Sequence, residues 1–238
     1  MHVMKVVILA AGEGTRLRPL TNHLPKPLIK ISGVSIIDRI FQSLPDEITE
    51  VILVVEYLKG KIISQMGNSF QGRPVHYIDQ VEMRGTLGAL FSAKPLLDAG
   101  ERFLVVSGDD VHDKAELQDC LSYDRSFGLQ LTKMPGYHSI HLDSNGYVEG
   151  FYPQTESEKA HGALTATGAY VLDSDIFDHP GVVLRSGKEF GLPQTMLAQK
   201  NIHPMKGVIT TKWLPINTPD DIERAQTILQ KVERKSHP

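Results

Sequence analysis

The stretch Val6-Val7-Ile8-Leu9-Ala10-Ala11-Gly12-Glu13-Gly14-Thr15-Arg16-Leu17-Arg18-Pro19-Leu20-Thr21, followed by Pro25-Lys26-Pro27, decides the organisation of this chain. Its apolar first half is typical of a strand that is buried on both faces of a parallel sheet. Two glycines then allow a sharp turn and a close approach of a ligand to the backbone. Three cations, Arg16, Arg18 and Lys26, follow, and backbone amides at such a turn attract phosphate. The stretch therefore predicts a phosphate-binding loop at the end of a buried strand.

Two familiar phosphate loops do not match this stretch. The dinucleotide fingerprint needs a third glycine three positions after the second, where this chain has Leu17. The P-loop needs four residues between its glycines and then Lys-Ser/Thr, whereas one residue separates Gly12 from Gly14. The two glycines alone fit an ordinary strand-to-helix turn equally well, so the surrounding residues must decide.

The complete string is more specific than its glycines. It resembles, at every fixed position, the N-terminal motif Gly-x-Gly-Thr-Arg-Leu-x-Pro-Leu-Thr-x-x-x-Pro-Lys of the nucleotidyltransferases that make nucleotide sugars. The resemblance implies that Arg16 and Lys26 are catalytic and hold phosphates. It also implies that the loop binds nucleotide through Leu9, Ala11, Gly12, Gly14 and Thr15.

Composition and charge bound the class of protein. The 238 residues, 41% of them hydrophobic and 22% charged, are typical of a globular chain with a sizeable core. The net charge of -3 argues against a bulk nucleic-acid binder. No run of residues approaches a membrane span, and the N-terminal apolar stretch lacks the pattern of a signal peptide. With Cys120 as the only cysteine, we expect a cytoplasmic protein that binds neither nucleic acid nor membrane.

Apolar runs and helical spacings alternate over the first half of the chain. Strands are predicted over 6–10, 51–55, 75–78 and 103–107. Helical patterns lie between them over 35–44, where Ser35 is a suitable N-cap, over 59–66 and over 85–97. Such short alternation is typical of a parallel sheet with crossover helices.

The second half is less regular. It predicts strands over 129–132, 139–142, 147–151 and 167–172, a hairpin turn at 143–146, a short helix over 193–198 and a last helix capped by Thr218. We therefore expect one domain over 1–238, with a nucleotide-binding half over about 1–112 and an acceptor-binding half over about 113–238. The pattern and the resemblance together imply an α/β fold of the nucleotide-diphospho-sugar transferase type. This is a Rossmann-like three-layer α/β/α sandwich with a mostly parallel mixed central sheet.

Asp109 follows the predicted strand 103–107. Ligands in open α/β sheets bind beyond the carboxyl ends of the strands. A carboxylate beside a phosphate loop suits Mg²⁺, which takes few protein oxygens and completes its shell with water and phosphate. A cap for the next helix is the alternative interpretation. Because Gly108-Asp109 resembles the family's Gly-Asp, whose Asp is a metal ligand, Asp109 is the first predicted ligand of Mg²⁺.

A second match is the string Gln80-x-Glu82-x-x-Gly85-Thr86-x-x-Ala89-Leu90. It resembles a segment of the family members that build uridine and related sugar nucleotides. There the Gln pairs with the base edge and the Gly-Thr backbone packs on nucleoside and sugar, which implies nucleotide contacts for Gln80, Gly85 and Thr86. A side-chain amide suits base recognition because it both donates and accepts hydrogen bonds. Without the resemblance, these residues would be interpreted as a polar surface position and a helix start.

A third match is the string Trp213-Leu214-Pro215-Ile216-Asn217-Thr218-Pro219-Asp220-Asp221-Ile222-Glu223-Arg224-Ala225. It resembles the closing motif of the superfamily, where an Asp or Asn beside the last helix is the second metal ligand. Some branches place that Asp where this chain has Pro215, which cannot bind a metal. Other branches use the position of Asn217, so we predict its amide oxygen as the second ligand. The alternative is that Asn217 only shapes the start of the helix.

The acceptor side departs most from the family. The Glu-Lys-Pro expected near Tyr152-Pro153, whose Lys contacts sugar phosphate in several branches, is absent. Four cations are candidates to replace that Lys, although a solvated surface position is the simpler interpretation of each: Lys133, Lys159, Arg185 and Lys188. Lys188 ranks first because Glu189 follows it, and Gly168 matches the family's Gly-x-Tyr strand. The predicted acceptor site is therefore Gly168, Lys188 and Glu189.

Together these residues predict a Mg²⁺-dependent enzyme that transfers an NMP group from an NTP to a sugar 1-phosphate and releases pyrophosphate. A cytidylyltransferase acting on phosphocholine or a polyol phosphate is the alternative enzyme. A non-catalytic subunit that senses nucleotide sugars is the alternative of another class, although it would not need Arg16, Lys26 and Asp109. Because the chain stops after its last helix, we expect no appended acyltransferase domain. The base, the sugar, and the choice between a monomer and a homo-oligomer stay open.

Overall fold

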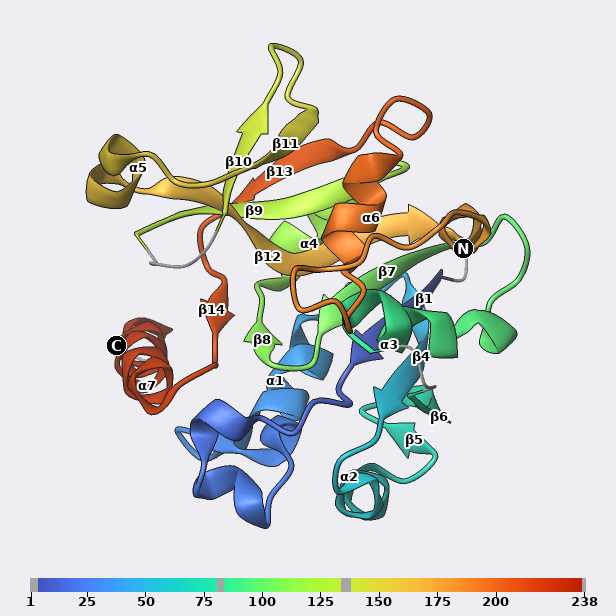
Figure 1. Cartoon of the computed structure of the whole chain (residues 1–238). Coiled ribbons are helices and arrows are strands. Elements are labelled where there is room, and N and C mark those ends of the chain that lie inside the picture. Colours follow the sequence, from blue (N-terminus) through green and yellow to red (C-terminus); the bar gives the residue numbers. More distant parts are fainter. Residues whose placement is uncertain (1–3, 81–83, 134–137, 237–238) are drawn as a thin grey trace.

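The computed structural model describes residues 4–80, 84–133 and 138–236, with side chains as far as residue 231. A central 8-stranded sheet has the spatial order β13-β9-β12-β7-β1-β4-β6-β5 (Figure 1). In chain order its strands are β1 (Met4–Leu9), β4 (Ile48–Val55), β5 (Ser69–Phe70), β6 (Arg73–Asp79), β7 (Arg102–Ser107), β9 (Ser126–Thr132), β12 (Ala163–Asp173) and β13 (Lys206–Thr210). Every strand predicted in the first half is confirmed, with small shifts at the ends.

The directions of the strands explain where a ligand can bind. β1 runs parallel to both β4 and β7, and β4 runs parallel to β6. β12 is antiparallel to β7 and to β9, and β13 is parallel to β9, which makes the sheet mixed. The predicted mostly parallel mixed sheet is confirmed. Because four neighbouring strands are parallel, the loops that leave their carboxyl ends meet at one edge.

Alternation along β1 divides the core into two layers. Val6 and Ile8 belong to one hydrophobic cluster and Val7 to the other, and all three side chains are fully buried. The first cluster is covered by α1 (Ile36–Ser43), α2 (Lys59–Met66), α4 (Lys114–Leu121) and α7 (Pro219–Ser236). The second is covered by α3 (Thr86–Ser92) and α6 (Leu192–Ala198). The three-layer α/β/α architecture is therefore confirmed.

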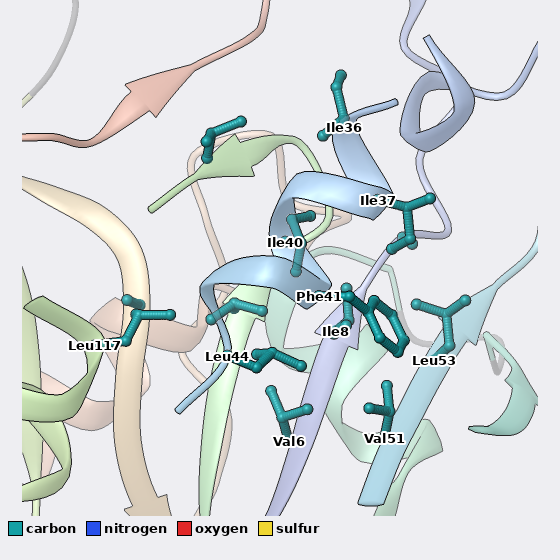
Figure 2. Packing of buried hydrophobic residues seen from close by; sticks show 14 of the residues in the cluster. Val6, Ile8, Ile36, Ile37, Ile40, Phe41, Leu44, Val51, Leu53 and Leu117 are labelled. Carbon is teal, nitrogen blue, oxygen red and sulfur yellow. The ribbon is translucent and has the colours of Figure 1, made fainter. Parts of the chain in front are cut away.

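Helix α1 shows how the sequence pattern becomes packing. Ser35 caps it, because its Oγ accepts a hydrogen bond of 3.2 Å from the backbone N–H of Asp38. Ile37, Ile40 and Phe41 then point at the strands, against Val51 and Leu53 among others (Figure 2). Burying such side chains contributes on the order of 2 kcal/mol each, so this face fixes the helix on the sheet.

Two other helix predictions had different outcomes. α2 begins and ends where predicted, at Lys59 and Met66. The helix predicted over 85–97 is wrong in its length: α3 ends at Ser92, and a separate 3-10 turn follows over η4 (Lys94–Leu96). Pro95 is the physical reason, because proline disfavours helical backbone in the residue before it and has no N–H for the helix.

Smaller elements complete the chain. β10 (Ser139–Leu142) and β11 (Val148–Tyr152) form the predicted hairpin, closed by a 2.8 Å hydrogen bond from the Asp143 N–H to the Tyr147 carbonyl. The remaining elements are β2 (Lys30–Ile31), β3 (Val34–Ser35), β8 (Asp110–Val111), β14 (Leu214–Pro215), α5 (Glu156–His161), η1 (Thr15–Leu17), η2 (Leu20–Asn22), η3 (Lys26–Leu28) and η5 (Ser174–Asp178). Among the described residues, none of the helices combines the length and the apolar character needed to cross a bilayer.

Candidate active site

A cavity of about 960 Å³ opens beyond the carboxyl ends of β1, β4, β6 and β7. Its lining brings together almost all of the predicted site residues from distant parts of the chain: Leu9, Ala11, Gly12, Gly14, Thr15, Arg16, Lys26, Gln80, Gly85, Thr86, Asp109, Lys188, Glu189 and Asn217. Gly168 is not among the lining residues. Glu82, which belongs to the Gln80 string, lies outside the described residues.

Contacts with Thr21 and Lys26 hold the loop after β1 in place. Gly14 has a left-handed backbone, with a φ of 64°, and the turn η1 begins directly after it. A Cβ at Gly14 would lie 3.1 Å from the Thr21 methyl group and 3.3 Å from the Cβ of Lys26. The buried Thr21 hydroxyl also donates a 2.9 Å hydrogen bond to the Gly14 carbonyl. Glycine is therefore required here both by conformation and by space.

The three cations of the opening stretch have different environments. Arg16 and Lys26 line the cavity. Arg18 instead donates a 2.9 Å hydrogen bond to Glu13 at the exposed side of the loop, and it is not among the lining residues. The structure thus separates two candidate phosphate ligands from one surface ion pair.

Four polar side chains meet in one cluster inside the cavity. The Lys26 ammonium lies 2.5 Å from Asp109 Oδ2 and 3.1 Å from Asn217 Oδ1. The Arg16 guanidinium donates a 2.8 Å hydrogen bond to the same Asn217 oxygen. Oxygens of Asp109 and Asn217 therefore converge on a single cationic position, and hard oxygen donors of this kind suit Mg²⁺.

Within the described residues, no group of three or more His, Cys, Asp or Glu side chains could hold a metal ion. A cage made only of protein ligands is therefore not available in that part of the chain. An ion held by one carboxylate and one amide would need phosphate and water for the rest of its shell, which is the usual pattern for Mg²⁺ with nucleotides.

Backbone pairing holds Asp109 and Asn217 in register with each other. β8 and β14 form a short antiparallel ladder in which Pro215 is opposite Asp110, and the Ile216 N–H donates a 3.1 Å hydrogen bond to the Asp109 carbonyl. The Asp221 carboxylate accepts hydrogen bonds from the backbone N–H of Asn217, at 2.8 Å, and of Thr218, at 2.9 Å. Pro215 is thus part of the ladder, while Asn217 presents its side chain to the cluster.

Asp110 lies behind the cluster and is buried. Burial and the neighbouring Asp109 charge raise the pKa of Asp110 well above its usual value, while Lys26 and hydrogen bonds from Trp213 and Ser107 act in the opposite direction. Burial lowers the pKa of the nearby His112 to about 4. Asp110 and His112 therefore form a buried layer that packs against the loop after β7.

Gly168 belongs to this supporting layer. Its φ is 77°, and a Cβ there would overlap the Asp110 carboxylate and the Ser107 hydroxyl. The close approach of β12 to the β7 loop therefore requires a glycine. Gly168 is not among the residues that line the cavity, and the acceptor contact predicted for it stays a prediction.

The loops after β4 and β6 form another part of the wall. Gln80 and Gly85 line the cavity together with Glu56, Tyr57 and Arg84, none of which is among the predicted site residues. Arg84 Nη1 lies 3.0 and 2.8 Å from the two carboxylate oxygens of Glu56. The signal for Glu56 and Tyr57 was present, because both directly follow a predicted parallel strand.

Gly85 and Thr86 join this wall to the segment that carries Lys188. A Cβ at Gly85, whose φ is 91°, would overlap the backbone of Phe190. The Phe190 N–H donates a 2.8 Å hydrogen bond to the Arg84 carbonyl, and the Leu192 N–H donates one of 2.9 Å to the Thr86 hydroxyl. These contacts give Gly85 and Thr86 a structural task in addition to the predicted nucleotide contact.

The segment 183–190 folds back on itself as a small hairpin. The Leu184 N–H donates a 2.7 Å hydrogen bond to the Glu189 carbonyl, and Val183 pairs with Phe190. Ser186, Lys188 and Glu189 at its end line the cavity. Of the alternative cations, Lys159 pairs with Glu156 at 2.5 Å on α5, and neither it, Lys133 nor Arg185 is among the lining residues.

Comparisons with known proteins identify the family of the chain. The family model described as "Nucleotidyl transferase" matches residues 5–231. The chain is 32% identical over 177 residues to the "Bifunctional protein GlmU" of Methanocaldococcus jannaschii, which covers 74% of this chain and 41% of that protein. It is 29% identical to the "UTP--glucose-1-phosphate uridylyltransferase AglF" of Haloferax volcanii, over 96% of this chain and 97% of that protein.

A solved structure of apo UDP-glucose pyrophosphorylase has a TM-score of 0.74 with this chain. It is 18% identical and covers 97% of this chain and 99% of its own, so it shows that the fold is shared. The matched part of the chain covers 41% of the length of the GlmU relative, but 97% of the length of AglF. On the family match, which covers almost all of its residues, the chain belongs to the nucleotidyl transferase family.

Proposed function

We propose that this protein transfers an NMP group from an NTP to a sugar 1-phosphate, with a divalent metal, and releases pyrophosphate. The observation that carries the proposal is the meeting of Arg16, Lys26, Asp109 and Asn217 in a cavity that also presents Gln80. The name of the Haloferax relative, which this chain matches from end to end, supports a sugar phosphate as the acceptor.

The residues of the cluster suit this chemistry. In the reaction, an oxygen of the acceptor phosphate forms a bond to the α-phosphorus, and the bond from that phosphorus to the pyrophosphate oxygen breaks. The acceptor oxygen is already ionised at neutral pH, so no general base is required. Arg16 and Lys26 hold the donor phosphates in line and neutralise charge that develops during transfer.

Asp109 and Asn217 would hold the metal, of which Mg²⁺ is our choice because both donors are hard oxygens. Such an ion, when bound, neutralises phosphate charge and orients the phosphoryl groups. Because an amide leaves the ion less neutralised than a second carboxylate would, we expect activity to depend steeply on Mg²⁺ concentration. Gln80 would contact the base, and Lys188 and Glu189 the acceptor.

The test is a grid of the four common NTPs against sugar 1-phosphates, a polyol phosphate and phosphocholine, with pyrophosphate release as the measurement. We expect release with at least one sugar 1-phosphate and its loss in Asp109→Ala. If pyrophosphate is released only with CTP and either phosphocholine or the polyol phosphate, the sugar 1-phosphate is not the acceptor and the enzyme is a cytidylyltransferase of that compound. NTP binding without release from any pair would favour a nucleotide-sensing subunit instead.

A further inference from the structure

The Lys26 ammonium occupies the position where the two predicted metal ligands converge. It lies 2.5 Å from Asp109 Oδ2 and 3.1 Å from Asn217 Oδ1, and its side chain is only 9% exposed. The cation predicted to bind phosphate is therefore engaged by the oxygens predicted to bind the metal. The Asp109 and Asn217 oxygens cannot bind a metal ion at this position while the Lys26 ammonium occupies it.

The second phosphate-binding cation is engaged in the same way. Arg16 donates its 2.8 Å hydrogen bond to Asn217 Oδ1, the oxygen that Lys26 also contacts. Without ligand, the four side chains of the cluster carry a net charge of about +1: one carboxylate faces the ammonium, and one uncharged amide oxygen is shared by two cations. A metal ion approaching Asp109 meets a carboxylate whose charge is already compensated.

The backbone of Lys26 is fixed, whereas its side chain has another direction available. The turn η3 begins at Lys26, and the Lys26 carbonyl accepts a 3.1 Å hydrogen bond from the Ile29 N–H. Gly14, in the loop predicted to hold phosphate, lies against the side-chain stem of Lys26. A four-carbon side chain with three rotatable donors can move from Asp109 to a phosphate bound at that loop without a backbone change.

We infer that Lys26 holds the place of the metal until a nucleotide arrives, so that the metal and the NTP bind cooperatively. The triphosphate offers Lys26 an anionic partner, Lys26 leaves Asp109, and the freed oxygens accept the ion. By linkage, each ligand must raise the affinity for the other by the same factor. The inference rests on the proposed function, because it takes Asp109 as a metal ligand.

The first test measures metal binding in the absence of nucleotide, with Mn²⁺ as the probe and free Mn²⁺ read by electron paramagnetic resonance. Lys26→Met removes the ammonium and keeps the length of the apolar stem. We expect this variant to bind Mn²⁺ about tenfold more tightly than the natural protein, a coupling of ordinary size. Equal affinities of the two proteins would overturn the place-holder role.

Lys188→Met is the matched control. It removes the same charge from the same cavity, and within the described residues Lys188 has no ion pair. We expect its Mn²⁺ affinity to change by less than about twofold, because the Lys188 side chain is exposed and solvent screens its charge. A tenfold gain in this control as well would show a general field effect and contradict the inference. If circular dichroism shows that Lys26→Met does not fold, Lys26→Gln takes its place in the Mn²⁺ binding measurement.

A second measurement adds an α,β-methylene NTP analogue and detects protein-bound Mn²⁺ by water-proton relaxation. Because the bound triphosphate itself supplies oxygens to the ion, both proteins should gain Mn²⁺ affinity, and the gain should be about tenfold larger in the natural protein than in Lys26→Met. Asp109→Asn in the Lys26→Met background separates the two proposals. If it abolishes Mn²⁺ binding while Lys26→Met binds like the natural protein, only the place-holder role fails. If it leaves Mn²⁺ binding unchanged, the proposed metal site itself fails.

Discussion

The two sides of the cavity are built by different physical means. The proposed nucleotide side consists of the loops after β1, β4, β6 and β7, and the proposed acceptor side is the hairpin 183–190. Strands such as β1, with Val6, Val7 and Ile8 fully buried, hold the first side from two packed layers. The hairpin is exposed from Arg185 to Glu189, and it is held by backbone hydrogen bonds from the Phe190 N–H to the Arg84 carbonyl and from the Leu87 N–H to the Phe190 carbonyl.

From this difference we expect the strand ends to position the reacting groups and the hairpin to determine acceptor specificity. Residues at the ends of buried parallel strands inherit the rigidity of the core. A hairpin docked by a few hydrogen bonds can vary in sequence and length with little cost to the fold. We therefore expect changes on the nucleotide side to lower the rate of transfer, and changes on the acceptor side to change acceptor affinity.

The largest expected effect is that of Arg16→Ala. Loss of a preorganised charged donor at the reacting phosphates should lower kcat by two to three orders of magnitude, about 3–4 kcal/mol. Arg18→Ala is the matched control, because Arg18 pairs with Glu13 in the exposed part of the loop and does not line the cavity. Its kcat should change by less than about twofold. Near-full activity of Arg16→Ala would remove Arg16 from the reaction.

Acid should loosen the nucleotide side through His112. The folded protein holds its pKa at about 4, below the ordinary value of 6.5, because the ring is buried. The unfolded chain therefore binds a proton first as the pH falls, and up to about 3 kcal/mol of stability is lost between pH 6.5 and 4. The raised pKa of Asp110 acts in the opposite direction, so the natural protein alone does not isolate this effect.

The measurement is urea unfolding at pH 7 and at pH 4.5, for the natural protein and for His112→Asn. Between these pH values the variant should lose less stability than the natural protein. The same loss in both proteins would mean that His112 does not titrate below its ordinary pKa in the fold.

Gly85→Ala should damage the contact between the two sides. A Cβ at this positive-φ position would overlap the Phe190 backbone, so the hairpin must move, and we expect a loss of about 2–3 kcal/mol in the free energy of unfolding. Gly33→Ala is the control: its φ of 83° is similar, but nothing lies within 4 Å of the added Cβ. That variant should lose about 1 kcal/mol, which is the conformational cost alone. Equal losses in both variants would contradict the crowding at Phe190.

The smallest expected effect is that of Lys188→Ala. It should raise the KM for the acceptor about tenfold, about 1.4 kcal/mol, and leave the KM for the NTP unchanged. Arg185→Ala, on the same hairpin but outside the cavity lining, should change the acceptor KM by less than about twofold. A rise in the KM for the NTP instead would place Lys188 on the nucleotide side and break the comparison.

Several elements were predictable because their signals are local. Unalternating apolar runs identified β1, β4 and β7, and Ser35 marked the start of α1. α4 was missed although Asp113 caps it by accepting hydrogen bonds from the Ala115 and Glu116 N–H groups, a pattern that a search for capping residues would find. β13 was missed because it is an edge strand in which only Val208 and Thr210 of the five residues are buried, so its apolar pattern is weak.

The sequence by itself determined the fold class and the family, and nearly all of the site residues that it predicted line the cavity, because glycines, apolar runs and fixed spacings are local properties. Only the tertiary structure decided which of these residues touch. That Lys26 lies between Asp109 and Asn217, and that Arg84 faces Glu56, depends on the parallel order of the strands and on the ladder between β8 and β14. Contacts of this kind join residues far apart in the chain, and their geometry is set by how the whole core packs.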